Sequence, residues 1–172
     1  MIHPERLTAE MDADFVIFLI GLRVNKLWKI HKWLPVIFAM PRMLKELKTM
    51  PASGLLSYEM WFGRTTIMVQ YWRSTEQLLA YAANKDAEHL PAWRAFNQSV
   101  GVNGDVGIWH ETYRISPGSF ENIYVNMPVF GLGKAGSLTP ASGKKYSAKD
   151  RFQSGDRSDA VSEKDANNSS QR

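Results

Sequence analysis

The chain has 172 residues, of which 44% are hydrophobic and 22% are charged, proportions typical of a soluble globular protein of about one domain. It contains no cysteine, which excludes disulfide bonds, thiolate zinc sites and a cysteine nucleophile, and which suits a reducing compartment. The formal net charge of +4 is shared between the body of the chain and its C-terminal tail, so it does not form the basic stripe that nucleic-acid binding requires.

Membrane insertion and secretion are not predicted. The longest apolar run covers residues 15–22, whereas a helix that crosses a bilayer needs about 20 apolar residues. The first six residues are polar and of mixed charge, unlike a signal peptide. We therefore expect a cytoplasmic protein whose partners include neither a membrane nor a nucleic acid.

The first two predicted elements are a strand and a helix. Residues 14–24 are β-branched or aromatic and apolar at nearly every position, which predicts a strand buried on both faces. Residues 30–48 have apolar side chains at a 3.6-residue period, including Trp33, Ile37 and Leu44, which predicts an amphipathic helix. Because proline lacks the amide hydrogen, Pro41 is expected to kink this helix or to start a second short one.

A hairpin follows this helix. Residues 55–62 and 65–73 are predicted strands, and Gly63 with Arg64 is predicted to join them as a two-residue turn. Ser74 or Thr75 is a suitable N-cap for the next helix.

The remaining ordered elements follow in alternation. A helix is predicted over residues 76–84 and a second helical piece over 88–100, which ends before two glycines. Residues 106–115 alternate well enough for a fourth strand, and residues 120–126 could add a short fifth strand or an edge segment.

The order β-α-β-β-α-β predicts an α+β, ferredoxin-like fold with an antiparallel sheet and helices on one side. The first strand is apolar on both faces, so the other side of the sheet needs a cover. A second copy packed sheet to sheet would supply it, and we therefore expect a homodimer. The predicted organisation is a flexible N-terminus over 1–12, one domain over 13–133 and a disordered polar tail over 134–172.

The sequence lacks the common catalytic signatures. It has no G-x-G-x-x-G before a helix, no P-loop, no G-x-S-x-G and no H-E-x-x-H, and no metal site is predicted. What remains is a set of six tryptophans and several histidines. Tryptophan and tyrosine favour sites with one polar partner, so these residues either pack the core and a dimer interface or line an apolar cavity for a planar substrate.

The first candidate for chemistry is His110, in the middle of the fourth predicted strand. Alternation groups it with Thr112 and Arg114 on one face, opposite Trp109 and Glu111. Histidine titrates near neutral pH, so His110 is either a proton-transfer group or a half-exposed residue that bonds its neighbours.

A second candidate is His89, at the start of the helical piece over 88–100. Trp93 and Asn97 follow it at four-residue spacing on one helix face, which is either a pocket wall or a polar helix start with Trp93 in the core. On the strand over 65–73, Gln70 and Trp72 share a face, so Gln70 is placed to bond into a cavity.

The predicted site combines these groups. The predicted catalytic residues are His110 and His89. The predicted substrate-binding residues are Trp93, Asn97, Gln70, Trp72, Arg114, Trp61 and Tyr58.

Several blocks of the chain are similar to one known family. The blocks cover residues 15–25, 31–35, 61–64, 69–73, 89–97, 107–114, 123–128 and 131–133. They resemble a family once catalogued as a domain of unknown function (DUF4188) and now described as similar to a fungal monooxygenase.

This resemblance implies a dimeric α+β barrel and kinship with the antibiotic-biosynthesis monooxygenases. Those enzymes use O₂ without metal or flavin, because a base forms a substrate carbanion that itself reduces oxygen. The resemblance thus implies no cofactor and a small hydrophobic, enolisable or aromatic substrate. Two alternatives stay open: a haem-binding barrel enzyme of the dehydratase or haem-degrading type, with His89 or His110 as axial ligand, and a non-catalytic module that binds a small ligand.

Overall fold

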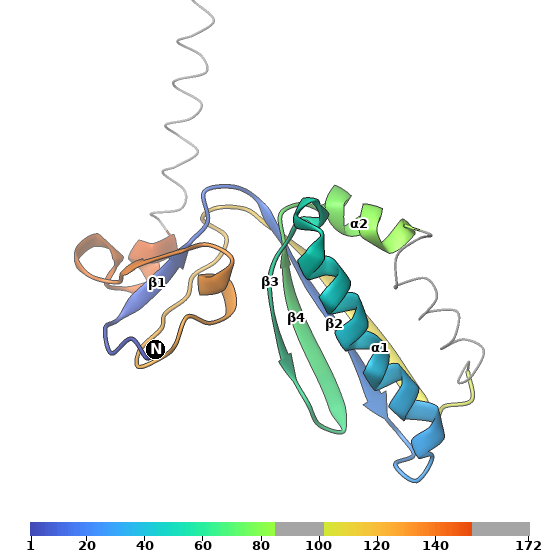
Figure 1. The fold of residues 1–172 in the computed structure, drawn as a ribbon. Helices are drawn as coiled ribbons and strands as arrows, with labels where there is room; N and C mark the ends of the chain where they lie inside the picture. The colour runs from blue at the N-terminus through green and yellow to red at the C-terminus, as the bar shows by residue number, and fades with distance from the viewer. Residues whose placement is uncertain (85–101, 153–172) are drawn as a thin grey trace, which may run out of the picture. The chain divides into compact units, whose positions relative to one another are not determined.

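The computed structural model describes residues 1–84 and 102–152 (Figure 1). These divide into two compact units: Val16–Tyr113, called here the sheet unit, and Met1–Phe15 with Arg114–Arg172, called the terminal unit. The predicted helical piece over 88–100 and the last part of the predicted tail lie outside the described residues.

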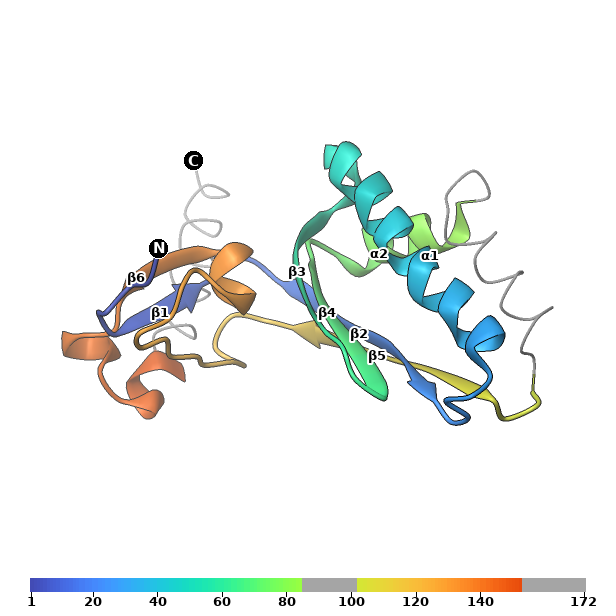
Figure 2. The ribbon, with the colours of Figure 1, turned by 60° about the horizontal axis from the view of Figure 1, so that its bottom comes forward.

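The sheet unit is built around a four-stranded sheet. Its strands lie in the order β3-β4-β2-β5, which is the strand order of a ferredoxin-like fold and confirms the predicted α+β class. The views in Figures 1 and 2 show α1 and α2 on the same face of this sheet. The elements are β2 (Phe15–Val24), α1 (Ile30–Thr49), η1 (Pro51–Ser53), β3 (Leu55–Trp61), β4 (Thr65–Trp72), α2 (Thr75–Ala83) and β5 (Val106–Ile115).

Cross-strand pairing fixes which side chains share a face. Strand β4 pairs antiparallel with both β2 and β3, so that Gln70 lies opposite Phe18 on one side and Tyr58 on the other. The register shifts between Leu55 and Ser57, where β3 bulges. Because side chains alternate along a strand, these pairs place Phe18, Gln70 and Tyr58 on one face.

The core lies between this face and the helices. Val16 and Trp72 from the sheet pack with Leu47 of α1 and Leu78 of α2 in one buried cluster. Further along the sheet, a second cluster holds Leu22, Val24 and Val106, with side chains of α1 packed against it. The apolar period of the sequence thus marked the correct face of α1.

Helix α1 is continuous through Pro35 and Pro41, so of the two outcomes predicted at Pro41, a kink or a second short helix, the second is wrong. Each proline removes one backbone hydrogen bond. Burial of Leu44 and Leu47, which follow Pro41, holds the later turns on the sheet and offsets this loss.

The hairpin differs from the prediction by one residue. Three residues, Phe62 to Arg64, separate β3 from β4, where a two-residue turn was predicted. The backbone N–H of Val24 donates to the Arg64 carbonyl at 2.9 Å, so the last residue of this turn also bonds to the end of β2. The predicted cap is confirmed: the Gln77 N–H donates to Ser74 Oγ at 3.3 Å at the start of α2.

The terminal unit joins the two ends of the described chain. Strand β1 (Leu7–Glu10) pairs antiparallel with β6 (Ser137–Pro140), and short 3₁₀ turns, η2 (Gly131–Lys134) and η3 (Gly143–Lys145), flank β6. The predictions of a flexible N-terminus and a disordered tail are therefore wrong for these segments. Neither segment has enough apolar surface to fold alone, but each satisfies the backbone groups of the other.

The predicted fifth strand over residues 120–126 is reduced to an isolated bridge. Tyr124 exchanges two backbone hydrogen bonds with Leu7, at 2.8 and 2.9 Å. This bridge belongs to the terminal unit. Among the helices of the described residues, none is both long enough and apolar enough to span a membrane.

Candidate functional site

A row of four side chains crosses the helix-covered face of the sheet, one from each strand. His110 of β5 lies beside Phe18 of β2, with ring centroids 5.8 Å apart and planes tilted by 43°. Phe18 pairs with Gln70 of β4, and Gln70 pairs with Tyr58 of β3. Three of these four residues were predicted as site residues, and pairing brings them into one line.

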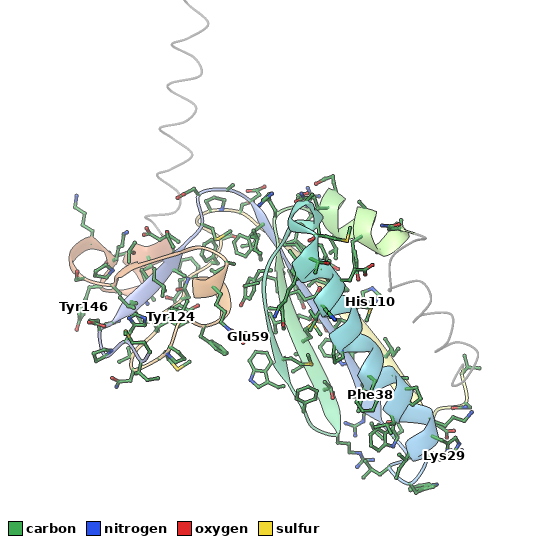
Figure 3. The ribbon with its side chains drawn as sticks, in the orientation of Figure 1. Lys29, Phe38, Glu59, His110, Tyr124 and Tyr146 are labelled. Carbon is green, nitrogen blue, oxygen red and sulfur yellow. The ribbon has the colours of Figure 1, made fainter. Side chains whose placement is uncertain are left out.

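His110 occupies the exposed end of this row. It lies on β5 (Figure 3), which is an edge strand of the sheet, and its side chain is exposed. The predicted alternation is confirmed on both sides: Ile108 packs with the cluster under α1, whereas the Trp109 indole lies against Gly21 on the opposite face. The structure thus gives His110 an imidazole open to small molecules with an aromatic ring beside it.

Gln70 and Trp72 share a face, as predicted, but both are buried. The Trp72 Nε1–H donates to Gln70 Oε1 at 2.9 Å, and Gln70 Nε2–H donates to the sulfur of Met68 at 3.0 Å. Trp72 is only 1% exposed and packs 5.9 Å from the Tyr81 ring. The structure therefore makes Trp72 a core residue that holds the Gln70 amide in place.

Tyr58 forms the other end of the row. Its side chain is half-buried, and the Lys48 ammonium lies 5.2 Å from the centre of its ring. This is a cation–π contact from the last turn of α1. It fixes a positive charge at the end of the row away from His110.

The other predicted residues do not join this row. Trp61 pairs with Ile67, which places it on the face that α1 and α2 leave uncovered, and it is 44% exposed. Arg114 is exposed and belongs to the terminal unit. The remaining predicted residues, His89, Trp93 and Asn97, lie outside the described residues.

The uncovered face of the sheet is largely apolar. Its half-buried side chains include Ile17, Leu19, Ile67 and Val69. Trp109 lies on the same face, and its Nε1–H is buried without a hydrogen-bond partner in the described part of the chain. This face therefore has both apolar surface and one unsatisfied donor.

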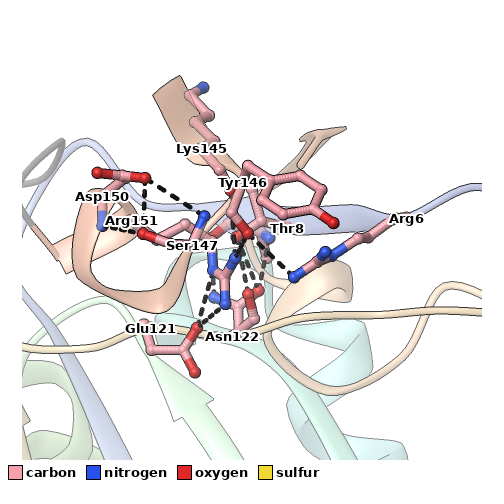
Figure 4. Close-up of polar contacts among 10 residues, drawn as sticks. Arg6, Thr8, Glu121, Asn122, Lys145, Tyr146, Ser147, Asp150 and Arg151 are labelled. Atoms are coloured by element: carbon pink, nitrogen blue, oxygen red, sulfur yellow. Dashed lines mark hydrogen bonds and ion pairs between the residues drawn. The ribbon is translucent and has the colours of Figure 1, made fainter. Parts of the chain in front are cut away.

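A separate hollow of about 220 Å³ lies in the terminal unit, lined by residues such as Glu10, Phe120 and Glu121. Two ion pairs join charged groups of its lining, and Figure 4 shows the one between Arg151 and Glu121. Arg151 is 2.6 Å from Glu121 and donates to two backbone carbonyls of η3 and the residue after it. Lys145 pairs with Glu10. These pairs tie the chain termini together.

In the same unit, the side-chain amide of Asn122 bonds to the backbone of β1, as the backbone of a neighbouring strand would. The Ala9 N–H donates to Asn122 Oδ1 at 2.6 Å, and Asn122 Nδ2–H donates to the Ala9 carbonyl at 2.9 Å. Sequence reasoning missed this site because its parts are more than 110 residues apart. No local pattern marks such a pairing.

Two carboxylates have shifted pKa values. Lys26 and Lys29 lie 2.8 and 2.7 Å from the buried Asp105 carboxylate, and their hydrogen bonds lower its pKa. In the terminal unit, the Ser147 hydroxyl donates to Asp150 at 2.6 Å and lowers the pKa of that carboxyl. Within residues 1–84 and 102–152, no group of three or more His, Asp or Glu side chains is arranged to hold a metal ion.

The strand order and the helix-covered row define a ferredoxin-like α+β protein with an exposed histidine on its edge strand. The chain belongs to the monooxygenase af470-like family, whose pattern matches residues 15–132. This confirms the family resemblance that the sequence blocks indicated.

One curated relative is "Monooxygenase af470" of Aspergillus fumigatus, 31% identical over 87 residues. The match covers 47% of this chain but only 30% of the relative, so the chain corresponds to less than a third of that protein.

Solved structures are similar to this chain to different degrees. A crystal structure of aldoxime dehydratase has a TM-score of 0.61 at 17% identity, over 86% of this chain and 43% of that one. The structure of SnoaB, a cofactor-independent oxygenase from Streptomyces nogalater, gives a TM-score of 0.43 at 14% identity, over 59% of this chain and 92% of that one.

Proposed function

We propose that this chain is an oxygenase that uses O₂, without a cofactor, to oxidise a small hydrophobic or aromatic metabolite. Membership of the monooxygenase af470-like family supports the reaction class. The observation that carries the site is His110, an exposed imidazole beside the Phe18 ring at the open end of the row. A base next to an apolar wall suits a substrate whose acidic hydrogen is on carbon.

In the proposed reaction, His110 removes a proton from a CH₂ group next to a carbonyl or an aromatic ring. The carbanion transfers one electron to O₂, and the two radicals combine into a peroxide. The protonated His110 returns this first proton to the peroxide. The second hydrogen of the same carbon then leaves as a proton, and the electrons of its C–H bond form the carbonyl as the O–O bond breaks. The departing hydroxide takes up this second proton and leaves as water. One oxygen atom ends in a new carbonyl and the other in water, so the CH₂ group supplies all four electrons and no external reductant is needed.

The other side chains of the row have supporting parts in this proposal. Phe18 contacts the His110 ring and offers an apolar surface for a planar substrate. Gln70, held by the Trp72 indole, and Tyr58 continue the wall across the sheet. Trp61, on the opposite face, has no part in it.

Four predicted residues outside this row stay in the proposal on sequence grounds alone. His89 is the alternative base, with Trp93 and Asn97 on its helix face. Arg114 remains a proposed donor to the substrate.

The experiment is oxygen uptake by the full chain against a panel of enolisable and quinol substrates. His110→Ala is expected to lower the rate by about 10²–10⁴-fold, the usual contribution of a general base. His31→Ala, an exposed histidine on α1, is the matched control and should not change the rate. If His110→Ala and His89→Ala both leave uptake unchanged, the assigned bases are wrong.

The same preparation separates the alternatives. If the protein is a cofactor-independent oxygenase, added haem should produce no Soret band that depends on His110 or His89. A Soret band that is lost when these histidines are replaced would favour the haem enzyme. Retention of a substrate without oxygen uptake would favour a binding module.

We also propose that a second copy covers the uncovered face of the sheet. That face has the apolar residues Ile17, Leu19 and Val69 in half-buried positions, and sheets pack face to face through such side chains. Sedimentation of the full chain should give the mass of a dimer, and Val69→Lys should give a monomer. A monomeric parent would contradict the proposal.

A further inference from the structure

Three loops lie side by side at one end of the sheet unit, and we call this surface the loop end. It comprises residues 25–29 between β2 and α1, 62–64 between β3 and β4, and 102–105 before β5. The Val24 N–H donates to the Arg64 carbonyl at 2.9 Å, and the Asn25 N–H donates to the Asp105 carbonyl at 3.0 Å. Asn25 Nδ2–H also donates to the Gly104 carbonyl at 3.1 Å, so the three loops are joined directly.

The loop end exposes large apolar side chains. Trp28 is 75% exposed and Phe62 is 70% exposed, and Leu27, Ile30 and Val102 are each more than half exposed. Exposed apolar residues scattered singly are ordinary, but a contiguous group marks an interaction site. Four of these five residues lie on the joined loops and the fifth, Ile30, is the first residue of α1, so the group has the character of an interaction site.

The backbone of the loop that carries Leu27 and Trp28 is held by hydrogen bonds. The Trp33 Nε1–H donates to the Leu27 carbonyl at 3.0 Å, and the Lys29 N–H donates to the Lys26 carbonyl at 3.2 Å. The loop backbone is thus fixed with the Leu27 and Trp28 side chains exposed, and Figure 3 labels Lys29 at the end of this loop.

The loop end is also strongly cationic. Lys26, Lys29 and Arg64 are its basic residues, and Arg23 at the end of β2 and Lys32 at the start of α1 adjoin it. Within residues 23–34, 60–66 and 102–107 the single acidic residue is Asp105, which is 2% exposed and paired with two of those lysines. The outward charge of this end is therefore positive.

The apolar surface continues along the start of α1. Ile30, Leu34 and Phe38 follow one another at four-residue spacing and are all exposed, so they form a line on the solvent side of the helix. Figure 3 labels Phe38 on this helix. Helix α1 is therefore apolar on two sides, and the core accounts for only one of them.

From these observations we propose that the loop end binds an anionic lipid surface. Leu27, Trp28 and Phe62 enter the boundary between headgroups and acyl chains, where tryptophan is favoured. The basic residues lie near the lipid phosphates, and each contributes attraction to an anionic leaflet. A nucleic acid would use the basic residues but not Leu27, Ile30 or Val102, so a lipid surface fits the whole patch better. This inference is independent of the proposed oxygenase reaction.

The test is co-sedimentation of the full chain with vesicles of phosphatidylcholine alone and of phosphatidylcholine mixed with phosphatidylserine. The chain should pellet with the mixed vesicles and much less with phosphatidylcholine, and high salt should weaken its binding. Equal binding to both vesicles, or binding to neither, would overturn the proposal.

Variants locate the contact. The double variant Leu27→Ser with Trp28→Ser should lower the partition coefficient at least tenfold, because two apolar side chains lose their burial. Lys32→Glu should lower it about tenfold through the reversed charge. Leu79→Ser in α2 and Lys149→Glu in the terminal unit are the matched controls, both at exposed positions, and should bind like the parent. Melting curves verify that each variant is folded.

Two other outcomes would overturn the proposal in favour of a different partner. If single-stranded RNA displaces the chain from vesicles, and the Leu27 and Trp28 double variant binds that RNA as well as the parent does, the basic residues serve a nucleic acid. If the double variant changes the mass of the protein in solution, the loop end is a contact between copies.

Discussion

The two units of this chain are stabilised by different interactions. In the sheet unit, apolar side chains from two helices and a sheet form buried clusters around Trp72 and Leu22. In the terminal unit, the buried residues include Thr8 and Arg151, and side chains such as Asn122 bond directly to the backbone. The sheet unit thus depends mainly on apolar area removed from water, whereas the terminal unit combines burial of Phe15 and Leu132 with side-chain hydrogen bonds to the backbone.

This difference explains why the sheet unit could be predicted from the sequence and the terminal unit could not. Helices and strands that bury apolar surface in a core need a periodic pattern of apolar residues, and that pattern can be recognised in the sequence. A polar network requires only that hydrogen-bonding groups come together in the folded chain. Groups more than 100 residues apart leave no local pattern in the sequence. The predictions below test whether the two units do respond differently, beginning with the largest expected effect.

The largest effect is expected in the core of the sheet unit. Trp72→Ala should lower the free energy of unfolding by about 3–5 kcal/mol, because it leaves a cavity and removes the donor to Gln70. Trp28→Ala is the matched control, since Trp28 is 75% exposed, and should change stability by less than about 0.5 kcal/mol. Urea denaturation measures both. Similar losses for the two tryptophans would contradict the assigned core.

The terminal unit should respond most to Arg151. Arg151→Ala removes the donor to Glu121 and to the Lys145 carbonyl, and it leaves the Tyr146 carbonyl with Arg6 as its donor. This loss should cost about 3 kcal/mol. Lys149→Ala, at an exposed position two residues away, should have almost no effect. Limited proteolysis is the measurement, and Arg151→Ala should expose cleavage sites in residues 137–152 before those in the sheet unit. Cleavage unchanged from the parent would show that the network is dispensable.

A smaller effect separates two strand glycines of the sheet unit. A Cβ at Gly21 would approach the Thr66 carbonyl oxygen to 2.0 Å and Trp109 Nε1 to 2.8 Å, whereas at Gly107 the nearest atoms are 3.9 Å away. Gly21→Ala should therefore lower stability by about 1–3 kcal/mol through overpacking. Gly107→Ala should be neutral or slightly stabilising. Thermal melting of the two variants checks this, and the reverse order would contradict the packing on the uncovered face.

The smallest effects concern pH, and they occur in both units. The pKa of Asp105 is lowered by the hydrogen bonds from Lys26 and Lys29, and that of Asp150 by the bond from Ser147. A lowered pKa in the folded state stabilises the protein above the unfolded value, near 3.8, and this contribution is lost as pH falls through the folded value.

Asp105→Asn and Asp150→Asn should therefore each lower the melting temperature at neutral pH. The difference from the parent should shrink as the pH falls below about 3.8. A difference that grows on acidification would contradict the direction of these pKa shifts.

At alkaline pH the dependence of stability on pH has the opposite direction. The Tyr113 hydroxyl donates to Glu111 at 2.5 Å, and this bond raises the pKa of the tyrosine. Its contribution is present below the usual tyrosine value of 10.0 and is lost as pH rises through the folded value. Tyr113→Phe should differ from the parent at neutral pH and converge with it in strong alkali.

Sequence patterns predicted much of the candidate site's framework. Alternation placed Gln70 and Trp72 together and separated His110 from Trp109, because a strand's period of two is rigid. What alternation could not show is that Phe18 lies between His110 and Gln70, since that depends on the order of the strands in the sheet. Alternation also could not show that Trp61 lies on the face opposite to the row. That placement follows from the pairing of Trp61 with Ile67.

The sequence by itself determined the strand over residues 15–24, the amphipathic face of α1, the cap of α2 and the family. The structural features follow from local periodicity or local chemistry, whereas the family follows from the similarity of the sequence blocks to a known family. The tertiary structure alone decided that residues 7–10 and 137–140 form a sheet, that α1 passes through Pro41, and that three loops join into one apolar and basic end. These features depend on contacts between distant segments, whose stabilisation appears only when the chain is folded.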